Sequence, residues 1–222
     1  MQVLNQYHFS PDSRTACVAI SIMALYHQYA NLDRVLGDKE WQTIMTRGTE
    51  LYKRWCAQDK ARGLRLPTVH QVLAIPDCKA FVDVFGAQPT EFAGLVRDAN
   101  GVDQPEGSLR HMLYEMARQC QDEAKTLCCL LVLPRVICVS VLAVPPKRRG
   151  ENCELRFFDS HDTQSVYCDY RVFHDAGTLL QYVLQKYPVA GWNSGDDNGT
   201  FISQSIEQVQ ANYGYSACMF IK

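Results

Sequence analysis

The sequence has no excess of basic residues, and this absence argues against two classes of partner. Its 222 residues carry 22 Lys and Arg against 24 Asp and Glu, for a formal net charge of −2. Without a basic patch or a polybasic tail, we expect neither nucleic acid nor an anionic membrane surface as a partner. The first 20 residues also lack the basic start and continuous apolar run of a secretory signal. The longest apolar stretch, 127–146, is interrupted by Pro134 and Arg135, so it predicts paired strands and no membrane span.

The ten cysteines form no C-x-x-C pair and show no zinc-finger spacing with histidine. Several lie within apolar periodic stretches, where a free cysteine behaves as a small hydrophobic residue. We therefore expect no metal and no other cofactor. We also expect a reducing compartment, the cytoplasm, or a host cytosol for a viral or bacterial protein. Residues 198–200 match a glycosylation sequon, which we take as a chance match in the absence of a secretory signal.

The sequence shows no internal repeat and no alternation of strands with helices, which excludes a parallel α/β layout. Apolar residues at helical spacing predict helices at 14–29, 36–56, 68–73, 109–120, 178–186 and 202–209. Strands are predicted at 127–133, 136–144, 154–159, 166–172 and 215–221, with shorter extended segments at 81–85 and 92–96. We therefore expect an α+β fold: a helical part at about 12–121, then a mostly antiparallel sheet part at about 126–222. The two parts form one domain of residues 1–222, and we expect a monomer.

The strand predicted at 154–159 ends in Asp159-Ser160-His161. Residues two apart in an extended chain point to the same face, so the Asp159 carboxylate can orient the His161 ring. An Asp-x-His at a strand end is common, and a polar loop start would explain it equally well. Asp162 is a rival orienting carboxylate, and His174 with Asp175 is the second choice of base.

This pair lacks a nucleophile, and Cys17 is the best candidate. It lies in the first turn of the first strong helix, which Asp12 or Ser13 can cap. A helix N-terminus carries partial positive charge and unpaired N–H groups, which favour a thiolate and can line an oxyanion site. Ser160 is a poorer nucleophile because no G-x-S-x-G motif surrounds it. The plain alternative is that Cys17 is one more buried cysteine.

Gln6 lies eleven residues before Cys17 in a lead-in predicted to be extended. Its amide can donate a hydrogen bond to a developing oxyanion, although Asn5 and Gln2 are rivals for this role. Papain-like enzymes combine an upstream amide, a cysteine at the start of a buried helix and a histidine from a later strand. In this arrangement Cys17 attacks the substrate, while His161 takes and returns the proton.

With these residues the sequence resembles the herpesvirus large tegument protein deubiquitinases and their cellular and bacterial relatives. The resemblance rests on Gln6 and the Cys17 helix, on the strands of 127–144 followed by Phe157-Phe158-Asp159-Ser160-His161, and on the helix at 178–186. The order Gln, Cys, Asp, His agrees with that family. The sequence departs from it in having Ala16 before the nucleophile, where Gln is frequent, and Ser160, where Pro is frequent.

The resemblance implies a papain-like cysteine protease fold and a cysteine deubiquitinase. Cys17, His161 and Asp159 would be catalytic, Gln6 would serve the oxyanion, and ubiquitin or a ubiquitin-like protein would be the partner. Acidic residues would meet the arginines of the ubiquitin tail, with Asp83, Glu91 and Asp98 as candidates. Two alternatives stay open: a papain-like peptidase, amidase or acyltransferase with another substrate, and a non-catalytic interaction domain in which Cys17 is a core residue.

Overall fold

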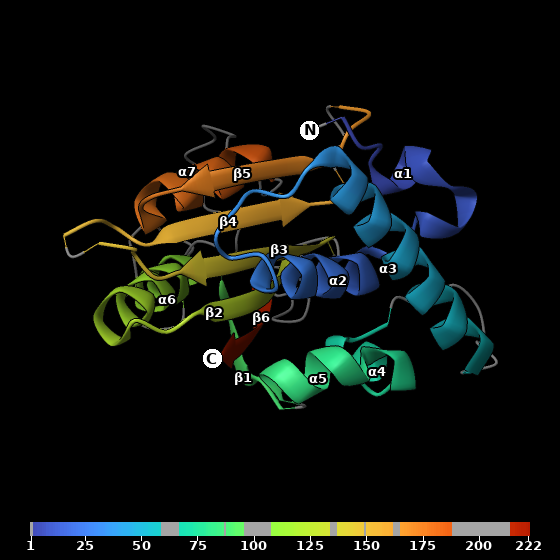
Figure 1. The fold of residues 1–222 in the computed structure, drawn as a ribbon, viewed down its shortest axis with the longest axis horizontal. Coiled ribbons are helices and arrows are strands. Elements are labelled where there is room, and N and C mark those ends of the chain that lie inside the picture. Colours follow the sequence, from blue (N-terminus) through green and yellow to red (C-terminus); the bar gives the residue numbers. More distant parts are fainter. Residues whose placement is uncertain are drawn as a thin grey trace, which may run out of the picture.

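The computed structural model describes residues 2–58, 67–86, 88–95, 108–133, 137–148, 150–161, 165–187 and 214–222. Its centre is a six-stranded sheet with the order β1-β6-β2-β3-β4-β5 (Figure 1). The strands are β1 (Thr90–Leu95), β2 (Leu127–Leu133), β3 (Ile137–Val144), β4 (Glu154–Asp159), β5 (Asp169–Phe173) and β6 (Gly214–Ile221). Neighbouring strands in this sheet are antiparallel, which confirms the predicted α+β class with a mostly antiparallel sheet.

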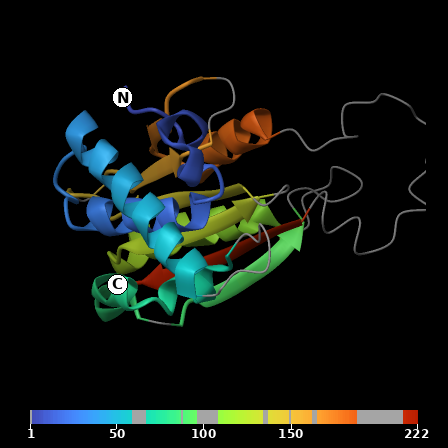
Figure 2. The same cartoon turned by 90° about the vertical axis from the view of Figure 1, so that its right-hand side faces the viewer.

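The helices cover both faces of the sheet. They are α1 (Gln6–Phe9), α2 (Cys17–Tyr29), α3 (Asp38–Gln58), α4 (Val69–Leu73), α5 (Lys79–Phe85), α6 (Leu109–Glu123) and α7 (Ala176–Lys186), with short 3₁₀ turns η1 (Pro11–Ser13) and η2 (Pro76–Cys78). Figure 2 shows α2 and α3 on one side of the sheet and α6 and α7 on the other. The layers therefore number three, with the sheet in the middle.

Strand β3 shows why both faces are apolar. Cys138, Leu142 and Val144 pack in the core beneath α2 and α3, whereas Val139, Val141 and Ala143 pack in the core beneath α6 and α7. Side chains alternate between the two faces of a strand, so a strand covered on both sides is apolar at nearly every position, and Ser140 is the one polar residue of β3.

Helix α2 is buried in the centre of its layer and lies across β3 (Figure 1). The Ser21 hydroxyl donates to the Cys138 carbonyl at 3.1 Å, and α3 packs closely on the outer side. A Cβ at Gly48 of α3 would lie 2.5 Å from the Ile20 backbone, so only glycine permits this approach. Trp41 of α3 stacks on Phe158 of β4 with ring centroids 4.6 Å apart. These contacts hold α2 against β3, and α3 against β4, the strand that ends in Asp159.

Several predicted elements are confirmed within a few residues, among them α2, α3, α4, α6, α7, β2, β3, β4 and β6. Thr68 and Ser108 are the N-caps of α4 and α6, as side-chain acceptors for Gln71 N and His111 N. The predicted strand at 166–172 is shorter and shifted, as β5. The helix predicted at 202–209 and the sequon at 198–200 lie outside the described residues.

Three local predictions were wrong. The segment at 81–85 is helical, in α5, because Phe81 and Phe85 reach the core together at helical spacing. The lead-in contains α1 and η1 and is not extended throughout. The N-cap of α2 is Ala16, without a side-chain cap, while Ser13 bonds with Ser10 in the preceding turn.

The predicted boundary between a helical part and a sheet part does not coincide with the layers. Strand β1 precedes the boundary but forms the edge of the sheet beside β6. Helix α6 also precedes it, yet packs with α7 on the face opposite α2 and α3. In the part of the chain that the structure describes, no helix combines the length and the apolar character needed to cross a membrane.

Candidate active site

The structure brings Cys17 and His161 together. Cys17 is the first residue of α2, and His161 follows the end of β4 by two residues. The Cys17 thiol and the His161 imidazole form a side-chain hydrogen bond. N–H groups in the first turn of a helix have no acceptor within the helix, so the sulfur lies beside donors that can face a developing negative charge.

Asp159 holds the His161 ring. One carboxylate oxygen, Oδ1, accepts from the His161 backbone N at 2.7 Å and lies 3.2 Å from Nδ1 of the ring. This contact engages Nδ1 and leaves Nε2 as the ring nitrogen available to the thiol. Asp159 and His161 are 0% and 5% exposed, so water competes little for these bonds.

The protonation states follow from these contacts. Burial would raise the pKa of Asp159, but the hydrogen bond and charge of His161, the Lys186 ammonium and the Tyr187 hydroxyl together lower it to about 2. Burial would lower the pKa of His161, but the hydrogen bonds and charges of Asp159 and Cys17 raise it to about 9. The contacts with Asp159 and Cys17 therefore favour the protonated form of His161 at neutral pH.

A second group of side chains, which the sequence did not reveal, supports Asp159. Its other oxygen, Oδ2, accepts from the Tyr187 hydroxyl and lies 3.1 Å from Lys186 Nζ. Lys186 also donates to Asp169 Oδ2 at 2.5 Å. The Lys186 side chain is 10% exposed, and its ammonium lies between two carboxylates that are buried as well. Lys186 ends an ordinary amphipathic helix, so no sequence signal marks it.

Gln6 lies next to this site, fully buried at the start of α1. Its Nε2 donates to the Arg14 carbonyl at 2.7 Å, and its Oε1 accepts from the Ser160 hydroxyl at 2.8 Å. A carbonyl oxygen can only accept, so the Arg14 contact determines which end of the amide carries the nitrogen. The nitrogen therefore faces the segment that leads into Cys17.

The rivals of Gln6 have other roles. Asn5 is the N-cap of α1, and its Oδ1 accepts from the Tyr7 and His8 backbone N–H groups. Gln2 is exposed, and its backbone N donates to Asp38 Oδ1 at 3.2 Å. Of the three amides, Gln6 is the one that contacts the residue between Asp159 and His161.

Tyr7 is a further neighbour that sequence reasoning missed. Its ring lies edge-on to His161 with centroids 5.9 Å apart, and the residue is 39% exposed. Burial, and then the charges of Cys17 and Asp159, raise the pKa of the Tyr7 phenol, which also hydrogen-bonds Gln6. A partly exposed ring therefore packs against the buried imidazole, and Cys17 itself is only 1% exposed.

The other candidates do not join this group. His174 precedes Asp175, which caps α7 by accepting from the Thr178 backbone N at 2.7 Å.

The acidic residues proposed to meet a substrate lie elsewhere. The exposed side chain of Asp83 pairs with Lys79 at 2.7 Å on α5, and Glu91 contacts His70. Asp98 and Asp162 lie outside the described residues.

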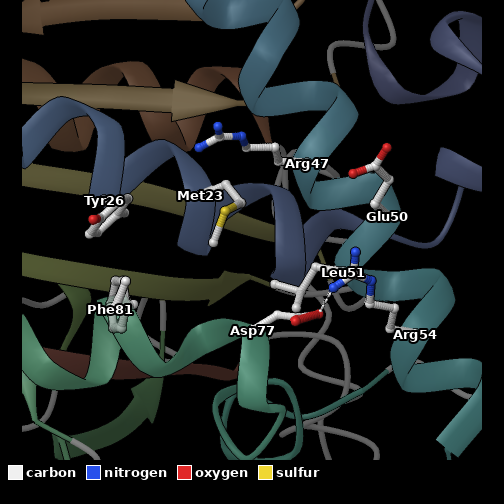
Figure 3. A pocket seen from close by; sticks show the side chains of 9 residues that line it. Met23, Tyr26, Arg47, Glu50, Leu51, Arg54, Asp77 and Phe81 are labelled. Carbon is white, nitrogen blue, oxygen red and sulfur yellow. Dashed lines mark hydrogen bonds and ion pairs between the residues drawn. The ribbon is translucent and has the colours of Figure 1, made fainter.

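A cavity of about 330 Å³ opens between α2, α3 and the η2–α5 segment, away from the catalytic candidates (Figure 3). Met23 and Tyr26 of α2 line it, with Arg54 of α3, whose guanidinium pairs with Asp77. None of Gln6, Cys17, Asp159 or His161 is among its lining residues.

One group of described side chains has the donor types of a metal site. His70, Glu91 and Cys218 place one ligand atom each within 4.8 Å of one another. The three residues come from α4, β1 and β6, and none of them belongs to the candidate active site.

The chain matches no protein-family model and no curated protein sequence. Among solved structures it is similar to the avirulence protein AvrPphB of Pseudomonas. That comparison has a TM-score of 0.48 and 9% identity, and covers 92% of this chain and 90% of that chain. A similarity of this size leaves the function to be argued from the site itself.

Proposed function

We propose that this protein is a papain-like cysteine hydrolase that cleaves the bond after the C-terminal glycine of ubiquitin or a ubiquitin-like protein. The observation that carries the proposal is the contact of Cys17, at the start of a buried helix, with an imidazole that Asp159 orients. A thiol, a base and a carboxylate in this order are the parts that covalent acyl transfer needs.

Cys17 and His161 supply the nucleophile and the proton transfers that both steps of the hydrolysis need. The Cys17 thiolate attacks the carbonyl carbon, and the new C–S bond gives a tetrahedral oxyanion. Breakage of the C–N bond sends the electron pair to the leaving amine, which takes a proton from His161. Water then attacks the thioester, His161 accepts one of its protons, and breakage of the C–S bond returns the thiolate and releases the carboxylic acid, which loses its proton to solvent.

The burial of the site favours a substrate that has no bulky side chains next to the cleaved bond. Cys17 is 1% exposed and His161 5% exposed, with Tyr7 against the ring. Side chains beside the cleaved bond would have to enter this covered space, whereas the paired glycines of a ubiquitin tail have none. The resemblance to tegument-type deubiquitinases supports the same substrate. The burial of Cys17 is also what a non-catalytic domain would show, so reactivity must separate the two.

The proposal is tested with ubiquitin that bears an electrophile at its C-terminus, followed by intact mass. We expect the wild-type protein to gain one ubiquitin and Cys17→Ala to gain none. His161→Ala should react far more slowly, because it lacks the group that maintains the thiolate. Cys56→Ala, which removes a partly exposed thiol of α3, is the matched control and should react like the wild type.

Other labelling results would favour a different substrate or a non-catalytic domain. Labelling of Cys17 by iodoacetamide without a ubiquitin adduct would keep the hydrolase and reject ubiquitin as its substrate. A Cys17 that resists both reagents in the folded protein would reject the hydrolase and favour an interaction domain.

Gln6→Ala is expected to lower kcat by about 10²-fold, since it removes one donor to the oxyanion. Alkylation of Cys17 by iodoacetamide forms no oxyanion and should keep its rate. The rates of hydrolysis and of alkylation are measured on the same preparations. Gln2→Ala, which removes another of the candidate amides, is the control and should change neither rate. An equal fall of both rates would mean that Gln6 acts only by supporting the fold around Ser160.

A further inference from the structure

His70, Glu91 and Cys218 converge at the β1 edge of the sheet. Glu91 and Cys218 are direct partners in the antiparallel pairing of β1 with β6. Directly opposed residues project from the same face with Cβ atoms about 4.5–5.5 Å apart. Cys218 packs against the core on the α2–α5 face, so Glu91 points to that face as well. The strand register therefore brings a carboxylate and a thiol together.

Helix α4 adds the third group. The N-cap Thr68 accepts from Gln71 N, which defines where α4 begins and places His70 in its first turn. His70 Nε2 contacts Glu91 Oε1 directly. The imidazole nitrogen, the carboxylate oxygen and the sulfur all lie within 4.8 Å of one another.

These atoms suit a particular class of cation. Zinc bonds to nitrogen, oxygen and sulfur are about 2.0–2.3 Å long, so ligand atoms on one tetrahedral ion lie roughly 3–4 Å apart. Rotations of the exposed His70 and Glu91 side chains cover the remaining distance. A thiolate and an imidazole favour zinc over magnesium or calcium, which prefer oxygen ligands. We propose that His70, Glu91 and Cys218 bind a zinc-class divalent cation, with water at the fourth position.

A thiol that coordinates a cation is deprotonated, so metal binding releases a proton from Cys218. The bound ion links α4 to the strands β1 and β6, and therefore stabilises the folded chain.

Cobalt(II) is the probe, because a cobalt–thiolate bond gives a charge-transfer absorption in the near ultraviolet. The titration uses metal-free Cys17→Ala protein, so that the catalytic thiol does not bind the ion. We expect one cobalt per chain with this absorption, its loss on addition of zinc, and a higher melting temperature with either metal.

Three further variants in the same background identify the ligands. Cys218→Ser should lose the charge-transfer absorption, and His70→Ala should weaken binding at least tenfold. Cys56→Ser, which alters another partly exposed thiol, should bind as tightly as its parent. The His70–Glu91 pair is exposed, so His70→Ala should fold normally and test the site even if Cys218→Ser does not. Absence of one-to-one binding, or the absorption surviving in Cys218→Ser, would overturn the proposal.

Discussion

Asp159→Asn is expected to lower kcat of the proposed hydrolysis by about 10³-fold. Both carboxylate oxygens accept from donors: Oδ1 from the His161 backbone N and ring, and Oδ2 from Tyr187 with Lys186 alongside. An asparagine has one accepting end only. If the NH₂ group faces His161, the ring loses its acceptor; if it faces the other way, it meets the Lys186 ammonium, and in both orientations the negative charge beside the ring is gone.

Asp159→Asn should also change how the reaction rate depends on pH. The pKa of His161 is raised to about 9, with the Asp159 hydrogen bond the largest effect that raises it. The rate of the wild-type enzyme should therefore fall as the pH rises through about 9, when the imidazolium loses its proton. In Asp159→Asn this alkaline fall should occur at lower pH. The rate is measured across the range with substrate well below KM.

Asp169→Asn is the matched control for Asp159→Asn. Asp169 also binds Lys186, but it contacts no atom of His161 among the interactions seen in the described residues. We expect this variant to lose stability while its kcat and alkaline fall stay close to the wild type. Equal kinetic effects of the two substitutions would show that Asp159 acts through the general stability of the network.

Lys186→Met is expected to lower the free energy of unfolding by about 3–5 kcal/mol at neutral pH. The methionine fills a similar space but leaves two buried carboxylates, Asp159 and Asp169, without their shared ammonium. For a chain of this length the loss corresponds to a melting temperature lower by roughly 6–20 °C. Denaturant titration and thermal unfolding measure the two quantities.

The sign of the pH effect follows from Asp159. Its pKa is lowered to about 2 in the folded protein, so its stabilising contribution is present above the ordinary value and lost as the pH falls towards 2. Lys186→Met removes one cause of that lowering. We therefore expect the difference between wild type and variant to shrink as the pH falls below about 4, where the Asp159 carboxylate of the variant takes up a proton.

Two control variants test whether the stability loss of Lys186→Met comes from the buried charges. Lys79→Met removes an ammonium from an exposed ion pair with Asp83 and should cost less than about 1 kcal/mol. Lys186→Met combined with Asp169→Asn removes one of the two carboxylate charges that Lys186 contacts and should regain part of the lost stability. A loss no larger than that of Lys79→Met would refute the role of Lys186 as the shared counter-charge.

Much of the fold was predictable because it depends on local periodicity. The apolar run of β2 and that of β3, which only Ser140 interrupts, fit strands buried on both faces, and the aromatic stripe of α3 fits the helical period of 3.6 residues. The short elements were less predictable. The segment 81–85 has an apolar pattern that fits a strand, and only packing of Phe81 and Phe85 with Phe220 of β6 makes the helix favourable.

The sequence by itself determined the class of fold and the local pair Asp159 and His161, whose spacing of two on a strand places both on one face. Only the tertiary structure decided that Cys17, 161 − 17 = 144 residues away, contacts that imidazole, and that Lys186 shares its charge between Asp159 and Asp169. It likewise decided the convergence of His70 with Glu91 and Cys218. Such contacts depend on strand register and layer packing, whose energies come from residues distant in the chain, so no local spacing encodes them.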